Sequence, residues 1–248
     1  IWVKANIRRT VGAAEAIFVH SVKAAQKMVE EFGISDSRCQ VIPFGDHAQG
    51  LIPPLERELA RRQLGLDGVE KLCLMYGTIN PYKGIEEVVV HWIREKRNCT
   101  LAVVGRVTDR SYATRLERLA EGQEEVKIQA LDTWMDDSTL RRWLSAADCA
   151  VFNYREIFTS GAASLARSFG LPILIPVRLD CVDLMEPHSH VFRFDSLEGN
   201  FAQRLAEALA IGPSYAAGVE WREAASWDKV ASLTAQVYER VLSERRGR

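Results

Sequence analysis

Short apolar runs rich in β-branched residues alternate with longer stretches of helical period along almost the whole chain. This alternation is typical of a parallel sheet with helices on its faces, because parallel strands need connections long enough to hold a helix. The 248 residues leave room for one large domain or two small ones, and an apolar fraction of 47% supports a buried core. We therefore expect an α/β fold and exclude a disordered chain or a short disulfide scaffold.

Charge and cysteine content exclude further classes of protein. Lys and Arg number 32 against 33 Asp and Glu, and this net charge of -1 argues against a nucleic-acid binder that works by bulk electrostatics. The apolar runs fall far short of the ~20 residues that a membrane-spanning helix needs. The 5 cysteines have no close pairs and are expected to be reduced, which predicts a cytoplasmic protein, with the inner face of the membrane as a further option.

The pattern predicts a short first block, a linker and a larger second block. The first block has expected strands at 16–20 and 39–42 with a helix at 22–32 between them. Residues 44–54 hold two glycines and two adjacent prolines and follow neither period, which indicates a linker. A helix is expected at 55–64.

The second block has six strand candidates separated by helical segments. The expected strands are 72–76, 100–104, 126–130, 149–152, 173–175 and 191–194, and the expected helices are 85–94, 111–121, 138–146, 161–169, 201–211 and 227–242. Right-handed crossovers give a doubly wound sheet, for which the order 3-2-1-4-5-6 is common. In that order the first and fourth strands are neighbours whose connections leave to opposite faces, so a ligand crevice opens at their carboxyl ends.

Lys83 lies in the loop after the first of these strands, where the next helix begins. A cation beside the amides of a helix start is unfavourable by about 0.3 to 1 kcal/mol, so its presence at the crevice indicates that an anion completes the site. The alternative is that Lys83 points to solvent or pairs with Glu86 or Glu87.

The loop after the fourth strand offers the complementary half of an anion site. Thr159, Ser160 and Gly161 begin a helix with small residues, so a ligand can approach its first amides closely. Ser160 also suits an ordinary N-cap, and the two roles are compatible. Arg155 has a planar guanidinium group that fits phosphate, with an exposed ion pair to Glu156 or another nearby acid as the alternative. A lysine and two helix starts suit a diphosphate.

Two further loops lie beside the expected crevice. Gly105 and Arg106 follow the second strand, although a glycine at a strand end is usually only a turn. Trp134 and Met135 follow the third strand and could flank an aromatic base, with a core role for Trp134 as the alternative.

Other functional motifs are absent. The sequence has no Walker motif and no G-x-G-x-x-G, which argues against a P-loop NTPase and an ordinary NAD site. None of the 6 tyrosines has a lysine four residues later, so an NDP-sugar epimerase or dehydrogenase is excluded. His188 and His190 have no third ligand at metal spacing, and no Ser-His-Asp arrangement has positional support. We predict neither a metal nor a cofactor.

Four strings resemble the donor-binding half of GT-B glycosyltransferases, especially those of family 4. They are YGTINPYKGIEEVV, LAVVGR, LRRWLSAADCAVFNYREIFTSGAASLARSFGLPILIP and SWDKVASLTAQVYERVL. The motifs G-x-I-x-x-Y-K-G, A-A-D, Y-R-x-I-x-T-S-G and A-x-S-x-G-x-P, in this order, are a specific combination. The earlier string AEAIFVHSVKAAQKMVEEFGISDSRCQVIPFGDH is similar to the last β-α-β unit of the partner domain and the interdomain crossing.

The resemblance implies a Rossmann-like domain that binds a UDP- or GDP-linked sugar. Lys83 would stabilise the diphosphate and Arg155 would assist it as the second catalytic cation, while preorganised amides and cations stabilise the departing nucleoside diphosphate. The implied donor-binding residues lie in the loops at the crevice: Gly77, Asn80, Lys83, Gly105, Arg106, Met135, Arg155, Thr159, Ser160 and Gly161.

The chain departs from the commoner family pattern at two places. Thr78 and Ile79 stand where that pattern has an arginine, for which Arg155 or Arg106 would compensate. The pattern also has a pair of glutamates, and here the second position is Leu165, while the first falls near position 157. The subgroup with T-S-G resembles bacterial enzymes of cell-surface polysaccharides and glycolipids.

The resemblance divides the chain into the end of an acceptor-side domain (1–43), the linker (44–54), the donor-binding domain (55–226) and a C-terminal helix directed back toward the N-terminal domain (227–248). The expected function is transfer of a hexose to a saccharide or glycolipid acceptor in cell-surface polysaccharide synthesis. The alternative is a noncatalytic nucleotide-sugar-binding subunit or an inactive fragment that needs a separate acceptor domain. Because an initial Met is absent, we expect a fragment, with peripheral membrane association through the missing N-terminal part.

Overall fold

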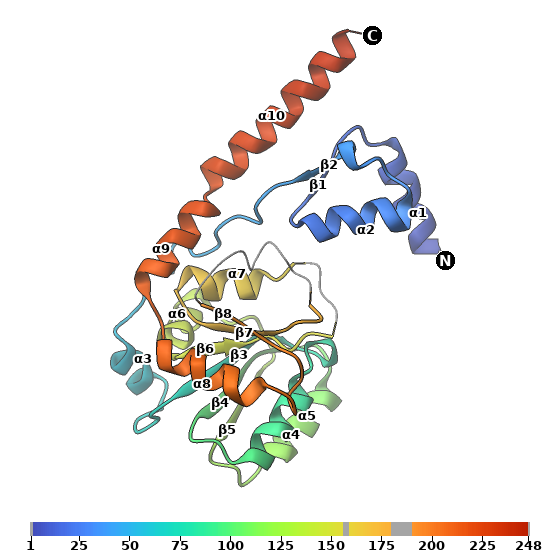
Figure 1. The fold of residues 1–248 in the computed structure, drawn as a ribbon. Coiled ribbons are helices and arrows are strands. Elements are labelled where there is room, and N and C mark those ends of the chain that lie inside the picture. The colour runs from blue at the N-terminus through green and yellow to red at the C-terminus, as the bar shows by residue number, and fades with distance from the viewer. Residues whose placement is uncertain (1, 156–158, 180–189, 248) are drawn as a thin grey trace.

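A six-stranded parallel sheet forms the larger part of the computed structural model, which describes residues 2–155, 159–179 and 190–247 (Figure 1). The strands lie in the order β5-β4-β3-β6-β7-β8, so the predicted doubly wound order is confirmed. Their bounds are β3 (Leu72–Ile79), β4 (Thr100–Val107), β5 (Val126–Leu131), β6 (Cys149–Val151), β7 (Ile173–Pro176) and β8 (Val191–Phe194).

Helices cover both faces of this sheet. One apolar cluster packs against α3 (Arg57–Gln63), α6 (Asp137–Ala146), α7 (Gly161–Ser168) and α9 (Tyr215–Ala224). The other packs against α4 (Ile85–Glu95), α5 (Arg110–Ala120) and α8 (Phe201–Ile211). Leu72 and Leu74 of β3 point into the first cluster, and Cys73 and Met75 into the second. The central strands are therefore apolar on both faces, as a buried parallel sheet requires.

The N-terminal part is a smaller unit of two helices and a two-stranded parallel sheet. It consists of α1 (Trp2–Ala13), β1 (Ile17–Val19), α2 (Val22–Phe32), a 3₁₀ turn (Asp36–Arg38) and β2 (Cys39–Val41). The side chain of Ser21 accepts a hydrogen bond from the amide of Ala24 at 2.9 Å and so caps α2, which ends at Gly33 with φ of 67°.

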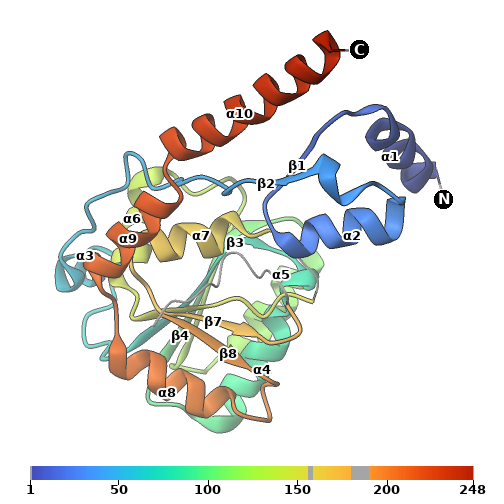
Figure 2. The same cartoon turned by 45° about the horizontal axis from the view of Figure 1, so that its top comes forward.

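The C-terminal helix α10 (Trp227–Arg246) lies on the same side of the large sheet as the N-terminal unit, above α7 (Figures 1 and 2). The rings of Phe18 and Tyr238 meet edge to face with centroids 6.0 Å apart, and Arg245 forms an ion pair with Glu15 at 2.8 Å. No helix in the described ranges is long and apolar enough to cross a membrane.

Several elements differ from the sequence-based expectation. Helices α1 and α9 were not predicted, and β3 and β4 each extend three residues further than expected. Gly77, expected in the loop after the first strand, and Gly105, for which a turn was the alternative, are paired in register inside the sheet. Each lies where a neighbouring backbone or side chain comes too close for a larger residue, so here glycine marks close approach and not the end of a strand.

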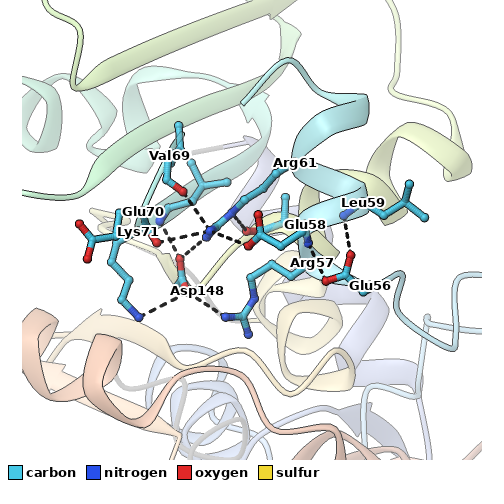
Figure 3. A network of polar contacts seen from close by, with 11 residues as sticks. Glu56, Arg57, Glu58, Leu59, Arg61, Val69, Glu70, Lys71 and Asp148 are labelled. Carbon is cyan, nitrogen blue, oxygen red and sulfur yellow. Dashed lines mark hydrogen bonds and ion pairs between the residues drawn. The ribbon is translucent and has the colours of Figure 1, made fainter. Parts of the chain in front are cut away.

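Asp148 of the A-A-D motif holds helix α3 onto the sheet (Figure 3). Its carboxylate is 1% exposed, lies 2.6 Å from Arg61 Nη2 and accepts the backbone N–H of Leu72 at 2.7 Å. Arg57 and Lys71 approach the other oxygen at 3.2 and 3.8 Å. This motif residue is therefore structural, because its oxygens are fully engaged at the amino end of the strands.

Candidate functional site

The carboxyl ends of β3 and β6 meet at the centre of the sheet. Cys73 pairs with Cys149 in parallel register, and the connections of the two strands run to α4 on one face and α7 on the other. The predicted switch point is therefore present, and residues 80–84, 152–155 and 159–160 border it.

Lys83 ends a 3₁₀ turn (Pro81–Lys83) that precedes α4, and its side chain folds back into the protein. It is 6% exposed, and its Nζ donates a hydrogen bond to the carbonyl oxygen of Tyr76 at 3.0 Å. The alternative of a solvent-exposed lysine is wrong. Pairing with the neighbouring glutamates is also wrong, since Glu86 binds Arg115 at 2.6 Å and Glu87 binds Arg155.

Burial lowers the pKa of Lys83 to about 8. A small cavity of about 10 Å³ beside the side chain is lined mainly by apolar residues, together with Thr78, Tyr76 and Tyr154, and includes no carboxylate. The ammonium group is thus held in a low-dielectric environment without a counter-ion among the residues that line it. Such an arrangement favours an anionic ligand, which would restore the charge balance.

Gly77 leaves space for the side chain of Lys83, and Gly105 leaves space for the backbone of Gly77. Gly77 has φ of 103°, and a Cβ there would lie 2.8 Å from Lys83 Nζ. A Cβ on Gly105 would lie 1.6 Å from the carbonyl oxygen of Gly77. The protein itself therefore requires both glycines, and their predicted contact with a donor stays a prediction.

The N-terminus of α7 lies on the opposite side of the switch point. Ser160 is its N-cap, as expected, with Oγ accepting the amide of Ala163 at 3.1 Å. The hydroxyl group of Tyr76 donates to the carbonyl oxygen of Ala162 and so ties the first turn of α7 to β3. The first amides of a helix have no intrahelical partner and carry partial positive charge, which makes this end suitable for a phosphate group.

Gly161, the first residue of α7, faces Phe44, in the segment predicted to be a linker. A Cβ at this position would lie 3.3 Å from the ring of Phe44. The aromatic ring therefore lies against the helix start, and an anion can approach the amides only from the sides that Phe44 leaves open.

Tyr154 was not singled out by the sequence analysis, although it stands in the Y-R-x-I-x-T-S-G motif. It is buried, its hydroxyl group shares a hydrogen bond of 3.2 Å with Ser160 Oγ, and Lys83 Nζ lies 5.5 Å from its ring centroid. Only the tertiary fold brings Lys83, in the loop after β3, close to this ring.

Arg155 forms the exposed ion pair that the sequence analysis gave as the alternative. Its Nη2 lies 2.5 Å from Glu87 Oε1 at the start of α4. A catalytic role for Arg155 stays a prediction and requires this pair to open.

The remaining predicted donor-binding residues have varied surroundings. Asn80 uses both polar atoms of its side chain inside the protein, since Nδ2 donates to Thr108 Oγ1 at 2.9 Å and Oδ1 accepts the amide of Tyr82 at 3.2 Å. Thr159 is half-buried, and Met135 packs against the core. A contact of these residues with a donor stays a prediction.

Arg106 and Trp134 form a stacked pair at the carboxyl ends of β4 and β5. The guanidinium carbon lies 4.2 Å from the centroid of the Trp134 ring, and Trp134 is 63% exposed. Arg106 Nε is buried and has no hydrogen-bond partner within the described residues. The core role for Trp134 is therefore wrong, and one face of a large aromatic ring is available at this edge.

Leu165 occupies the position where the commoner family pattern has a glutamate, and it is buried in the core. Residues 156–158, 181 and 188, on which other sequence-based expectations fall, lie outside the described residues. Within the ranges that the structure describes, no three His, Cys, Asp or Glu side chains gather as a metal site would require.

Comparison with known proteins finds glycosyltransferases among the sequence relatives and solved structures with the fold described above. The chain matches no family model. It is 30% identical over 105 residues to a GDP-mannose:glycolipid 4-beta-D-mannosyltransferase from Xanthomonas campestris pv. campestris, which covers 42% of this chain and 29% of the relative. It is 27% identical over 257 aligned positions to a D-inositol 3-phosphate glycosyltransferase from Xylanimonas cellulosilytica, which covers 97% of this chain and 60% of the relative. The chain thus spans 60% or less of the length of these relatives.

Solved structures with the same fold include a sucrose-phosphate synthase from Thermosynechococcus elongatus. Its TM-score is 0.76 at 20% identity, and the match covers 97% of this chain and 62% of that one. HepE from Anabaena, in complex with UDP and glucose, matches with a TM-score of 0.73 at 16% identity, over 97% of this chain and 67% of that one. The fold is that of GT-B glycosyltransferases, and the predicted resemblance is confirmed.

Proposed function

We propose that this chain is the donor-binding half of a glycosyltransferase that transfers a hexose from a nucleoside-diphosphate sugar to a saccharide or glycolipid acceptor in cell-surface polysaccharide synthesis. The diphosphate would lie between Lys83 and the first turn of α7, with its base toward Trp134. A lipid-linked acceptor would bring the protein, in the cytoplasm, to the inner face of a membrane.

The ammonium of Lys83 is the observation that carries this proposal. A buried cation without a carboxylate among its lining residues is unfavourable, and it lies at the strand ends where doubly wound sheets bind ligands. The start of α7 adds amides and a helix dipole on the other side. Together they suit an anion with more than one phosphate group.

The mechanism that follows is electrostatic. As the bond between the sugar and the diphosphate breaks, negative charge builds up on the leaving phosphate oxygens. Lys83 and the amides of Ser160 and Gly161 would stabilise that charge from fixed positions, so little reorganisation is needed when the bond breaks. Water is nearly excluded around Lys83, so its attraction for the leaving phosphate is stronger than it would be at an exposed position.

The exposed ring of Trp134 supports a place for the base. Arg106 covers one face of the ring, and a base stacked on the other face would bury the apolar surface that is now in water. The name of the mannosyltransferase relative gives GDP-mannose as its donor, and HepE was solved in complex with UDP and glucose. The proposal therefore includes both bases.

Calorimetry with UDP and GDP tests the proposal and identifies the base. We expect one of them to bind with micromolar to millimolar affinity, and we expect Lys83→Ala to weaken binding at least about tenfold, as loss of a charged hydrogen bond does. Absence of binding to either nucleotide at millimolar concentration would refute the donor site. Binding without transfer to any acceptor would favour the noncatalytic subunit.

A further inference from the structure

Tyr154 lies between the two halves of the proposed diphosphate site. It follows β6 and is 3% exposed. Its ring centroid lies 5.5 Å from Lys83 Nζ, and its hydroxyl group lies 3.2 Å from Ser160 Oγ. A single side chain thus contacts both the cation and the N-cap of α7.

The ring stabilises the cation. An ammonium group within about 6 Å of an aromatic centroid is attracted by the negative face of the ring, and more strongly where water is excluded. The titratable groups that line the cavity beside Lys83 are Tyr76 and Tyr154. Tyr76 presents its carbonyl oxygen to Lys83 while its hydroxyl group donates to Ala162.

Charged groups nearby on α4 and after β6 and β7 are engaged elsewhere. Glu87 pairs with Arg155, and Glu86 pairs with Arg115 of α5. Arg178, after β7, donates to Asn153 Oδ1 at 3.0 Å and to the carbonyl oxygen of Tyr154 at 3.3 Å. The Tyr154 ring and the Tyr76 carbonyl are therefore the described groups that offset the burial of the ammonium.

The hydroxyl group of Tyr154 acts on the helix. Ser160 Oγ accepts the amide of Ala163 at 3.1 Å, and its hydrogen bond with Tyr154 holds it in that capping position. The rings of Phe152 and Tyr82, with centroids 5.7 and 5.8 Å from that of Tyr154, flank the tyrosine. Its position is thus fixed from three sides.

We infer that Tyr154 is a positioning residue, which holds the Lys83 ammonium and the first turn of α7 at a fixed separation. The inference rests on the proposed function in one respect, because it takes the anion between them to be a nucleoside diphosphate. Tyr154 does not touch the reacting atoms, and it acts through the two groups that do.

The test compares three variants in the whole chain. Tyr154→Phe keeps the ring and removes the hydrogen bond to Ser160, and Tyr154→Leu removes both. Phe194→Leu is the matched control, since Phe194 is also a buried aromatic residue but belongs to the other core cluster. The pKa of Lys83 is measured without ligand from the NMR shift of its side-chain nitrogen, and UDP and GDP affinities are measured at pH 7.

We expect Tyr154→Leu to lower the pKa of Lys83 by about 0.5 or more, while Tyr154→Phe and Phe194→Leu leave it unchanged. Nucleotide affinity should fall about threefold in the phenylalanine variant and more than tenfold in the leucine variant. An unchanged pKa of Lys83 in Tyr154→Leu overturns the inference. If that variant does not fold, Tyr154→Phe decides, and wild-type affinity in it overturns the inference.

Failure of the proposed function gives a different result. In that case the wild-type chain binds neither nucleotide, yet the pKa of Lys83 still responds to Tyr154→Leu. If the wild type binds in a Lys83-dependent way and both Tyr154 variants match it, the function stands and the inference falls.

Discussion

Lys83 Nζ lies 3.0 Å from the carbonyl oxygen of Tyr76, in surroundings that leave the lysine only 6% exposed. One carbonyl satisfies one of the three N–H donors of an ammonium group, and no acid lines the adjacent cavity. The contact holds Lys83 in place without neutralising it. The charge of Lys83 therefore lowers the stability of the fold, whereas binding of an anionic ligand requires it.

Replacement of Lys83 by methionine is expected to stabilise the protein and, like Lys83→Ala, to weaken nucleotide binding at least about tenfold. The pKa of Lys83 in the folded protein, about 8, lies below the ordinary lysine value of 10.5, so the folded state disfavours the charged form. Removing the charge should raise the free energy of unfolding at pH 7 by about 1 to 3 kcal/mol. Urea denaturation at pH 7 measures the gain.

The same experiment has a pH control and a residue control. Wild-type stability should rise relative to the variant as pH increases from about 8 to 10.5, because the unfolded chain then binds more protons than the folded one. Lys127→Met, at an exposed lysine of β5, should change stability little. A destabilised Lys83→Met would contradict the account.

Nucleotide affinity should decrease as the pH rises through the pKa of Lys83. The charged lysine binds the diphosphate, and it loses its proton above about pH 8, whereas arginines keep theirs. Bound anion raises this pKa, so the decrease begins somewhat above that value. Calorimetry with UDP and GDP between pH 7 and 9.5 checks it, and a flat profile in this range would exclude Lys83 from the site.

Trp134→Ala should distinguish the contribution of the base to affinity from that of the phosphates. Stacking of a base on an aromatic ring is worth roughly 1 to 3 kcal/mol, so the affinity for the nucleoside diphosphate should fall about fivefold or more. Binding of inorganic pyrophosphate should be unchanged, since Trp134 lies at the end of β5 and contacts Arg106 there. Equal losses for both ligands would argue against stacking.

Asp148→Asn should destabilise the chain without changing the donor site. The substitution leaves the buried Arg61 without its carboxylate, which costs about 3 to 5 kcal/mol for a buried pair. Arg57→Gln is the control, because Arg57 is 37% exposed and its ion pair is expected to contribute about 1 kcal/mol or less. Thermal or urea unfolding measures both, and nucleotide affinity of the folded Asp148→Asn protein should equal that of the wild type.

The sheet order and the switch point could be predicted because they depend on local pattern and on the handedness of crossovers. Runs such as Leu72 to Tyr76 are apolar throughout, and few topologies connect six such strands. The place of Lys83 and of the start of α7 followed from that order. The α9 helix could not be predicted, since its apolar face is weak and Gly218 interrupts it where Ser168 comes close.

The direction of side chains at the site could not be predicted from the sequence. Lys83 is followed by two glutamates, yet it turns inward because Gly77 leaves space for its ammonium group. Arg155 stands in the expected loop, yet its guanidinium group pairs with Glu87 of α4. Both outcomes depend on which loops the fold brings together, and no spacing along the chain encodes that.

NMR titration can show whether a diphosphate binds between Lys83 and the first turn of α7. The amide of Gly161 and the side-chain nitrogen of Lys83 are observed in one labelled sample while UDP or GDP is added. We expect both signals to move and to saturate at the same nucleotide concentration. Shifts confined to other parts of the chain, or saturation of one signal without the other, would contradict it.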